Sequence, residues 1–159
     1  MMNIIREYRN EDAQQVERCL IELQDYERQI DSHLIDGKTI AKKYLEHMFS
    51  RCLETNGKVF VVDVDNSVVG FVSIWAKVKS RAIEEQQYEY AYISDLVVLA
   101  DYRGRGLGRA LLQKAEDYAV LQGARLLRIA VLAKNHTAKE LYHNFGFQDR
   151  LIELSKSLG

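Results

Sequence analysis

A short loop in which arginine and glycine alternate constrains this chain more than any other feature. Its sequence is Arg103-Gly104-Arg105-Gly106-Leu107-Gly108. It follows the apolar run 92–99, which is rich in β-forming residues, and it opens the segment 107–119, in which apolar residues recur at helical spacing. Glycines let the backbone approach an anion, and free N–H groups and the helix dipole point toward it at a helix start. The strand–loop–helix unit therefore predicts a phosphate site, to which Arg103 and Arg105 would add charge-assisted contacts.

Other phosphate-binding loops fit this sequence less well. A P-loop ends in Gly-Lys-Ser/Thr, whereas Gly108 is followed by Arg-Ala. A dinucleotide-binding loop has the spacing Gly-x-Gly-x-x-Gly and an acidic residue about 20 positions later. Here the glycines alternate with other residues, and the later stretch 125–128 reads Arg-Leu-Leu-Arg. A dinucleotide-binding domain and a plain glycine-rich surface turn remain the alternatives.

A second motif follows the predicted strand 126–132. It consists of an Asn, an Ala and a Tyr before a Gly-Phe pair, at Asn135, Ala138, Tyr142 and 146–147. Together with the Arg-x-x-Gly-x-Gly pattern that begins at Arg103, this motif resembles the GCN5-related N-acetyltransferase (GNAT) family. The resemblance covers about residues 90–150.

The resemblance implies a mixed α/β fold, with a central mixed sheet flanked by helices, and acetyl-CoA as cosubstrate without a metal. In this family the backbone of the fourth strand binds the pantetheine arm and supplies an oxyanion donor, while the glycine-rich loop holds the pyrophosphate. Asn135 would cap the next helix and could also contact the pantetheine. The implied acyl-CoA-binding residues are Leu96, Val97, Val98, Arg103, Gly104, Arg105, Gly106, Leu107, Gly108 and Asn135.

The resemblance also implies that Tyr142 is the general acid that protonates the departing thiolate. Tyr142 could instead be a packing residue, because it belongs to an apolar stripe at helical spacing with Ala138, Leu141 and Phe145. The motif register with Asn135 favours the catalytic role.

The general base is less well defined by the sequence. Some family members carry a glutamate where this chain has Tyr92 or Ala130, and the nearest carboxylates are Glu89 and Asp95. A strand period of two would place Asp95 on one face with Ile93 and Val97, where a carboxylate needs a partner. Asp95 would then either anchor a structural hydrogen bond or orient the acceptor amine or a water.

The segment 22–27, together with 93–96, is similar to the diamine and polyamine branch of the family. Carboxylates there would attract a cationic amine. That branch carries Glu-Asp where this chain has Ser94-Asp95, so half of the feature is missing. Charge on a helix surface is the simpler explanation of Glu22, Asp25 and Glu27.

The rest of the chain predicts an α/β order within one domain, 1–159. Strands are expected at 3–8, 58–63, 68–79 and 148–154, and helices at about 11–29 and 39–53. Asp65-Asn66 marks a hairpin turn, and 80–88 is an exposed connection.

Composition excludes several classes of protein. The net charge of −1 argues against general nucleic-acid binding. No apolar stretch is long enough to span a membrane, and the N-terminus lacks signal-peptide features. The two cysteines are expected to be free thiols, which suits the cytoplasm. The histidines are not spaced as the ligands of a metal ion would be.

The sequence therefore predicts an enzyme that moves an acetyl group from acetyl-CoA directly to a small, cationic primary amine. The alternatives are acetylation of a protein N-terminus or lysine, and a non-catalytic acyl-CoA sensor. A homodimer is possible, because many proteins that the chain resembles form one.

Overall fold

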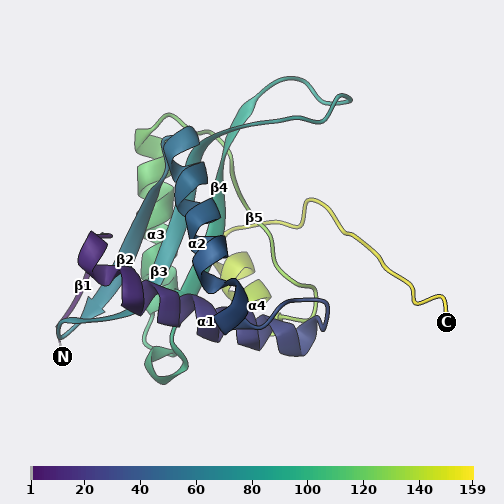
Figure 1. Ribbon diagram of the computed structural model, residues 1–159. Helices are drawn as coiled ribbons and strands as arrows, with labels where there is room; N and C mark the ends of the chain where they lie inside the picture. The colour runs from purple at the N-terminus through teal and green to yellow at the C-terminus, as the bar shows by residue number, and fades with distance from the viewer. Residues whose placement is uncertain (1) are drawn as a thin grey trace.

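The computed structural model describes residues 2–159 and builds them around one five-stranded sheet (Figure 1). The strand order is β1-β2-β3-β4-β5, antiparallel from β1 to β4, with β5 parallel to β4. The strands are β1 (Asn3–Glu7), β2 (Lys58–Val64), β3 (Ser67–Lys79), β4 (Glu89–Val98) and β5 (Leu127–Ile129). The helices are α1 (Ala13–Ile30), α2 (Gly37–Glu54), α3 (Leu107–Leu121) and α4 (His136–Phe145). This arrangement confirms the predicted mixed α/β class.

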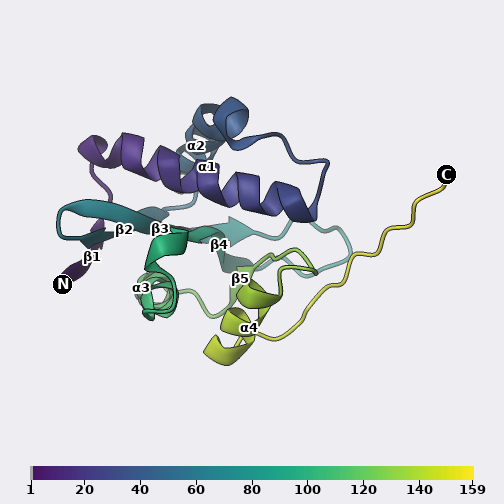
Figure 2. The ribbon, with the colours of Figure 1, turned by 90° about the horizontal axis from the view of Figure 1, so that it is seen from below.

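The helices lie in two layers, α1 and α2 on one face of the sheet and α3 and α4 on the other (Figure 2). Each layer buries an apolar stripe against the strands, which gives two cores. Val16 of α1 and Met48 of α2 pack with Val97 of β4 in one core. Leu111 of α3 and Tyr142 of α4 pack with Ile93 of β4 in the other.

Strand β4 has an irregularity at Ser94, where its buried side chains change from one core to the other. Ser73 of β3 pairs with Asp95, and the next residue of β3, Ile74, pairs with Ile93. Ser94 is therefore an extra residue, as in a β-bulge, which re-aims the side chains that follow it. The expectation that Asp95 shares a face with Ile93 is wrong for this reason: Ile93 faces α3, whereas Asp95 faces α2.

Strands β4 and β5 pair only over a short distance. Their paired residues run from Ala91 to Ile93 on β4 and from Leu127 to Ile129 on β5. Beyond the bulge, β4 continues to Val98 without a β5 neighbour, so the two strands separate there. The predicted strand 126–132 is accordingly shorter in the structure.

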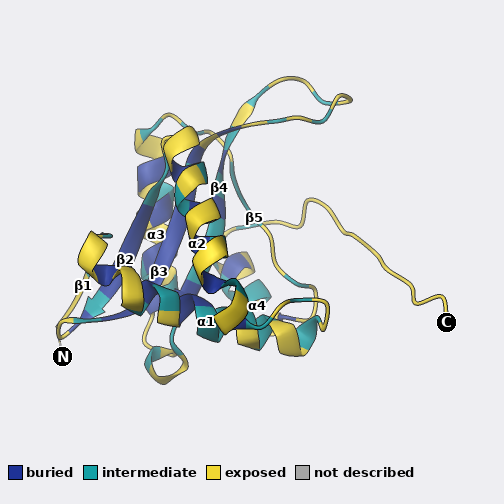
Figure 3. Cartoon of the chain, viewed as in Figure 1, coloured by how far each residue is buried: buried dark blue, intermediate teal, exposed yellow. Residues whose placement is uncertain are grey.

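The predicted last strand, near 148–154, is absent. Residues 147–159 have no regular secondary structure and run away from the body of the protein (Figure 1). Their side chains are almost all exposed, as the yellow C-terminal trace shows (Figure 3). The segment has a β-forming pattern, but a strand also needs a partner edge, and this segment finds none within its own chain.

The other elements agree with the sequence to within a few residues. Asp65 and Asn66 both adopt positive φ, at 50° and 69°, and form the expected hairpin turn between β2 and β3. The segment 80–88 is a connection, as expected, and extends well beyond the sheet (Figure 1).

Candidate active site

A cavity of about 410 Å³ opens where β4 and β5 separate. Its walls come from α1, the end of β4, the loop before α3, the residues after β5, and α4. The lining residues are Leu23, Tyr26, Glu27, Ile93, Ser94, Asp95, Leu96, Val97, Val98, Tyr102, Arg103, Gly104, Gly106, Leu107, Gly108, Arg109, Ile129, Ala130, Val131, Asn135, Thr137, Ala138, Leu141 and Tyr142. All the predicted site residues except Arg105 are among them.

The glycine-rich loop forms one end of this cavity. Gly104 and Gly106 have φ of 76° and 77°, a left-handed conformation that side chains with a Cβ rarely adopt. Gly106 is the N-cap of α3, so the free N–H groups of the first helical turn face the cavity end. Gly108 needs to be small for a different reason, since a Cβ there would lie 3.1 Å from Leu141 Cδ2 of α4. The loop thus has the geometry of an anion cradle.

The arginines around the loop differ in their contacts. The guanidinium of Arg103 donates through Nε to the carbonyl of Val98 at 3.0 Å and lies over the ring of Tyr26. Arg105 donates to the carbonyl of Asp101 and lies over Tyr102. Arg109, on the first turn of α3, lines the cavity and was not predicted. Its position one residue after the motif was the available signal.

We expect Gly106→Ala to weaken acetyl-CoA binding about tenfold or more, because the alanine must adopt a strained backbone or deform the cradle. Isothermal calorimetry with acetyl-CoA measures this change. Gly123→Ala is the matched control, because Gly123 has φ of 92° at the far end of α3, outside the cavity lining. Both variants should lose stability, by roughly 1–2 kcal/mol. Equal acetyl-CoA affinities in the two variants would contradict this role of the loop.

Asn135 and Tyr142, at the start and within α4, also line the cavity. Asn135 is buried, and its side-chain oxygen accepts a hydrogen bond from the backbone N–H of Ala138 at 3.2 Å, as expected for an N-cap. Tyr142 is 8% exposed, and its ring packs edge-on against Phe147. Burial raises the pKa of the Tyr142 phenol above its ordinary value, and the nearby carboxylates of Glu27 and Asp95 raise it further by smaller amounts. The phenol therefore stays protonated at neutral pH, as a proton donor must.

Asp95 also lines the cavity, and its carboxylate lies on the α2 side of the sheet. Tyr44 of α2 donates its hydroxyl to both carboxylate oxygens, at 2.8 and 3.0 Å. Burial raises the pKa of Asp95 to about 7, against the opposing effect of the Tyr44 hydrogen bond. The partner that the sequence required for Asp95 is thus Tyr44. A carboxylate that titrates near neutral pH can exchange protons with a substrate under physiological conditions.

Glu27 of α1 lines the cavity as well, which overturns its interpretation as surface charge. Burial raises the pKa of Glu27, and Glu27 in turn raises the pKa of Asp95. A signal was present, because Glu27 follows Leu20 and Leu23 at the spacing of the buried face of α1. Tyr44 likewise falls within the apolar stripe of α2 next to Leu45. Glu22 and Asp25 make structural contacts instead, with the backbone N–H groups of Ala100 and Gly37.

Three further features of the described residues concern metal sites, membrane spans and cysteines. Among residues 2–159, no group of three or more His, Cys, Asp or Glu side chains is placed to hold a metal ion. None of the described helices is both long and apolar enough to cross a membrane. Cys19 and Cys52 are buried free thiols.

The cavity thus combines a separated strand pair, an anion cradle at a helix start, a buried carboxylate and a protonated tyrosine, an arrangement that is typical of acyltransferases. Residues 19–147 match the model of the acetyltransferase (GNAT) family. The chain belongs to this family, so the predicted resemblance and the predicted class of enzyme, an N-acetyltransferase, are confirmed.

Named N-acetyltransferases of other organisms are similar to this chain in sequence. An uncharacterized N-acetyltransferase, MJ1207 of Methanocaldococcus jannaschii, is 34% identical over 125 residues, which cover 79% of this chain and 53% of that protein. The chain thus spans about half the length of this relative. The thialysine N-epsilon-acetyltransferase of Bos taurus is 27% identical over 147 residues, which cover 92% of this chain and 84% of that one.

Solved structures share the fold. A point mutant of the BH1408 protein of Bacillus halodurans superposes with a TM-score of 0.80 at 20% identity, covering 98% of this chain and 99% of that one. The aminoglycoside N-acetyltransferase AAC(6')-Iy, solved in complex with CoA, superposes with a TM-score of 0.67 at 15% identity, covering 98% and 100%.

Proposed function

We propose that this chain is a single N-acetyltransferase domain that transfers the acetyl group of acetyl-CoA directly to a small, cationic primary amine. The observation that carries the proposal is the arrangement of the cavity. The anion cradle, the carboxylates of Glu27 and Asp95, and the Tyr142 phenol all line one cavity. Such a cavity offers contacts to both an anionic donor and a cationic acceptor.

The donor would be held mainly by backbone groups. The N–H groups at the start of α3 and the loop 103–108 would take the pyrophosphate of acetyl-CoA. The backbone of 96–98 lacks a β5 neighbour, so its groups on that side of β4 would bind the pantetheine arm as a neighbouring strand would. The carbonyl of Val98 already accepts a hydrogen bond from Nε of Arg103. Asn135 would contact the same arm. A backbone N–H in 96–98 would also stabilise the oxyanion of the tetrahedral intermediate, a contribution of about 3–4 kcal/mol in other acyl transfers.

The acceptor would lie between Glu27 and Asp95. A cationic amine would gain from both carboxylates and would lose its proton to Asp95, whose pKa is raised by burial to about 7. The neutral amine would attack the thioester carbon, and the nitrogen of the tetrahedral intermediate would still carry a second proton that must leave before the amide forms. As the intermediate collapses, the C–S bond would break and Tyr142 would give its proton to the departing thiolate, which leaves as the thiol of CoA. The tyrosinate would then take up the second amine proton, which restores the phenol.

The preference for a small amine has independent support. The bovine relative is named for acetylating the epsilon amine of thialysine, a small amino acid. The homodimer considered from the sequence also remains a proposal. A cytoplasmic location remains a prediction that two free thiols suit.

Thiol release from acetyl-CoA, measured with a panel of acceptors, tests the function. We expect the highest kcat/KM for small diamines or lysine analogues, since the carboxylates of Glu27 and Asp95 both line the cavity. A peptide with a free N-terminus or an internal lysine serves as the competing acceptor class, and turnover of peptides alone would reassign the substrate.

Calorimetry with acetyl-CoA separates the remaining outcomes. Tight binding without turnover of any amine would indicate a sensor, and the enzyme proposal would fail. Binding of NAD in preference to acetyl-CoA by the folded protein would contradict the assignment of the loop.

A further inference from the structure

Arg128 of β5 carries more hydrogen-bond donors than its surroundings accept. A guanidinium has five N–H donors and keeps its positive charge in proteins. Among residues 2–159, Arg128 makes one hydrogen bond, which Nη2 donates to the hydroxyl of Tyr88. Its Nε is buried and has no acceptor in the described part of the chain. Donors of Arg128 are therefore left for a ligand that brings acceptor atoms.

Two aromatic rings fix the position of this guanidinium. Its Cζ atom lies 4.3 Å from the ring centroid of Tyr90 and 5.2 Å from the ring centroid of Tyr88. The rings attract the cation through their π-systems and hold its planar fork in place. Such a fork binds an anion with less loss of side-chain freedom than a flexible ammonium group would.

The carboxylate of Glu85 lies near Arg128 but already has other partners. Its Oε1 accepts a hydrogen bond from Arg150, and its Oε2 accepts from the hydroxyls of Ser80 and Tyr88. The pKa of Glu85 is lowered mainly by the hydrogen bonds from Tyr88 and Ser80, and to a smaller extent by the charges of Arg150 and Arg128. Two arginines and one glutamate leave a net positive charge at this end of the sheet, which an anion would offset.

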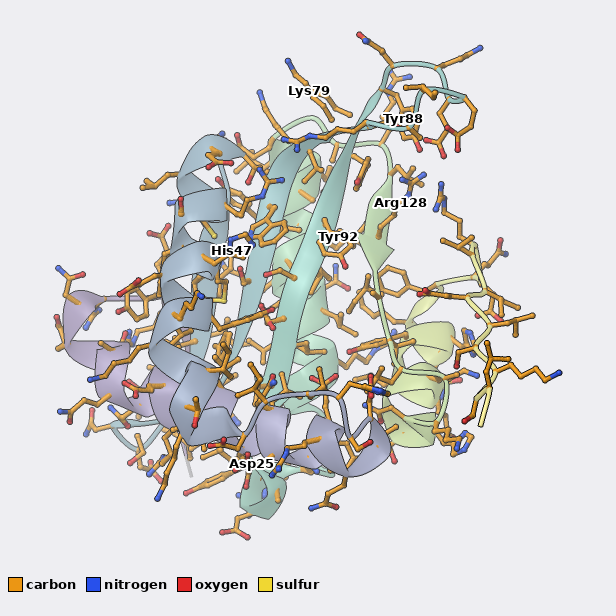
Figure 4. The ribbon with its side chains drawn as sticks, turned by 45° about the vertical axis from the view of Figure 1, so that its right-hand side comes forward. Asp25, His47, Lys79, Tyr88, Tyr92 and Arg128 are labelled. Atoms are coloured by element: carbon orange, nitrogen blue, oxygen red, sulfur yellow. The ribbon has the colours of Figure 1, made fainter. Side chains whose placement is uncertain are left out.

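Arg128 lies on the same face of the sheet as Asp95. In the pairing of β4 with β5, Arg128 is opposite Tyr92, whose ring packs on Trp75 in the core beneath α1 and α2. Burial raises the pKa of Tyr92, and the Asp95 carboxylate raises it further by a smaller amount, so Tyr92 is within electrostatic reach of Asp95. Tyr92 and Arg128 lie beside each other on this face, with Tyr88 beyond them (Figure 4). A ligand that reaches from Asp95 to Arg128 would cross the Tyr92 ring.

The separation of these two residues limits the length of such a ligand. Tyr92 precedes Asp95 by three residues on β4, which is at most about 10 Å along a strand. An extended chain covers about 1.2 Å per bond, so two groups that are about six bonds apart lie about 7 Å from each other. The side chains of Arg128 and Asp95 would cover the remaining distance.

We propose that the acceptor amine carries a carboxylate about six bonds from its nitrogen, and that Arg128 binds this carboxylate while the nitrogen lies at Asp95. The inference rests on the proposed function and names amino acids with a terminal side-chain amine, or ω-amino acids, as the class of acceptor. A carboxylate would accept two hydrogen bonds from the guanidinium fork. A diamine would instead bring a second cation to Arg128, where like charges repel.

Thiol release from acetyl-CoA with two matched acceptors tests the proposal. The probes are ε-aminocaproate and its amide, which present the same amine on the same chain and differ in the charge of the far end. We expect the wild-type protein to have a kcat/KM for ε-aminocaproate that is about tenfold to a hundredfold higher than for the amide. Because Arg128→Met removes the cation and keeps an unbranched side chain against Tyr90, the ratio of the two values should fall to about one.

Two further variants show whether the charge or its geometry matters. Arg128→Lys keeps the charge but lacks the fork, so its ratio should lie between those of the wild type and Arg128→Met. Arg125→Met is the matched control, because Arg125 is an exposed arginine just before β5, and this variant should keep the wild-type ratio. Circular dichroism confirms that each variant is folded.

The outcomes separate this inference from the proposed function. Similar kcat/KM values for the two probes in the wild type would overturn the carboxylate site and leave the acetyltransferase standing, as would an Arg128→Met variant with the wild-type ratio. The wild-type ratio decides the matter even if Arg128→Met does not fold. Absence of thiol release with these probes and with every other amine would remove the proposed function, and this inference with it.

Discussion

Asp95→Asn is expected to lower kcat by about 10²–10⁴-fold and to remove the rise in rate with pH that an ionising base produces. In the wild type, burial raises the pKa of Asp95 from 3.8 to about 7, so kcat/KM should increase with pH up to about 7 and then level off. Without the carboxylate, the rate should instead follow the ionisation of the acceptor amine at higher pH. Steady-state kinetics between acid and alkaline pH measure both effects.

Two further variants separate catalysis from structure. Tyr44→Phe removes the hydroxyl that stabilises the ionised form of Asp95, so the pKa of Asp95 should rise and the ascending limb should move to higher pH. Asp117→Asn alters an exposed carboxylate of α3 and should leave the profile unchanged. If kcat/KM of the Asp95→Asn variant still rose with pH as it does in the wild type, the assignment of Asp95 as the base would be contradicted.

The raised pKa of Asp95 also predicts how the stability of the protein depends on pH. The folded state holds the Asp95 proton more tightly than the unfolded chain, so the free energy of unfolding should fall as pH rises from about 3.8 to about 7. Asp95→Asn lacks this contribution. The difference in thermal stability between variant and wild type should therefore grow in favour of the variant across this range.

Tyr142→Phe is expected to reduce kcat by about a hundredfold or more, with little change in acetyl-CoA affinity, because it removes the proton donor to the thiolate and keeps the ring that packs on Phe147. The defect should shrink with an acetyl thioester whose thiol has a lower pKa, since such a thiolate leaves without a proton. Thiol release with the two donors measures this difference.

Tyr118→Phe is the matched control for that variant. Its hydroxyl donates to the carbonyl of Asn56, outside the residues that line the cavity, so its loss should affect stability and leave kcat intact. Tyr142→Phe turnover equal to that of Tyr118→Phe would remove the general-acid role.

The site could be predicted in part because two of its components are local. The anion cradle depends on glycines that alternate within one turn and on the helix that follows, and both are visible in the sequence around Gly106. The N-cap at Asn135 and its spacing to Tyr142 are local in the same way. The environment of Asp95 depends on contacts between distant elements: Tyr44 and Asp95 are 51 positions apart and meet only because α2 packs on the sheet.

The bulge at Ser94 shows where periodicity stops being sufficient. An extra residue in one strand cannot be read from alternation alone, because it is defined by the partner strand, here at Ser73 and Ile74. The sequence placed Asp95 in an apolar surrounding that required a partner. Only the pairing of β3 with β4 decided which core it faces.

The residues by themselves determined the α/β order, the family and the phosphate-binding loop, because these follow from backbone propensities and short-range spacing. Tertiary structure decided which carboxylates reach the cavity, where β4 separates from β5, and that the β-forming segment after Arg150 remains unpaired. Burial and pairing are properties of two surfaces that meet, and a single segment of sequence specifies only one of them.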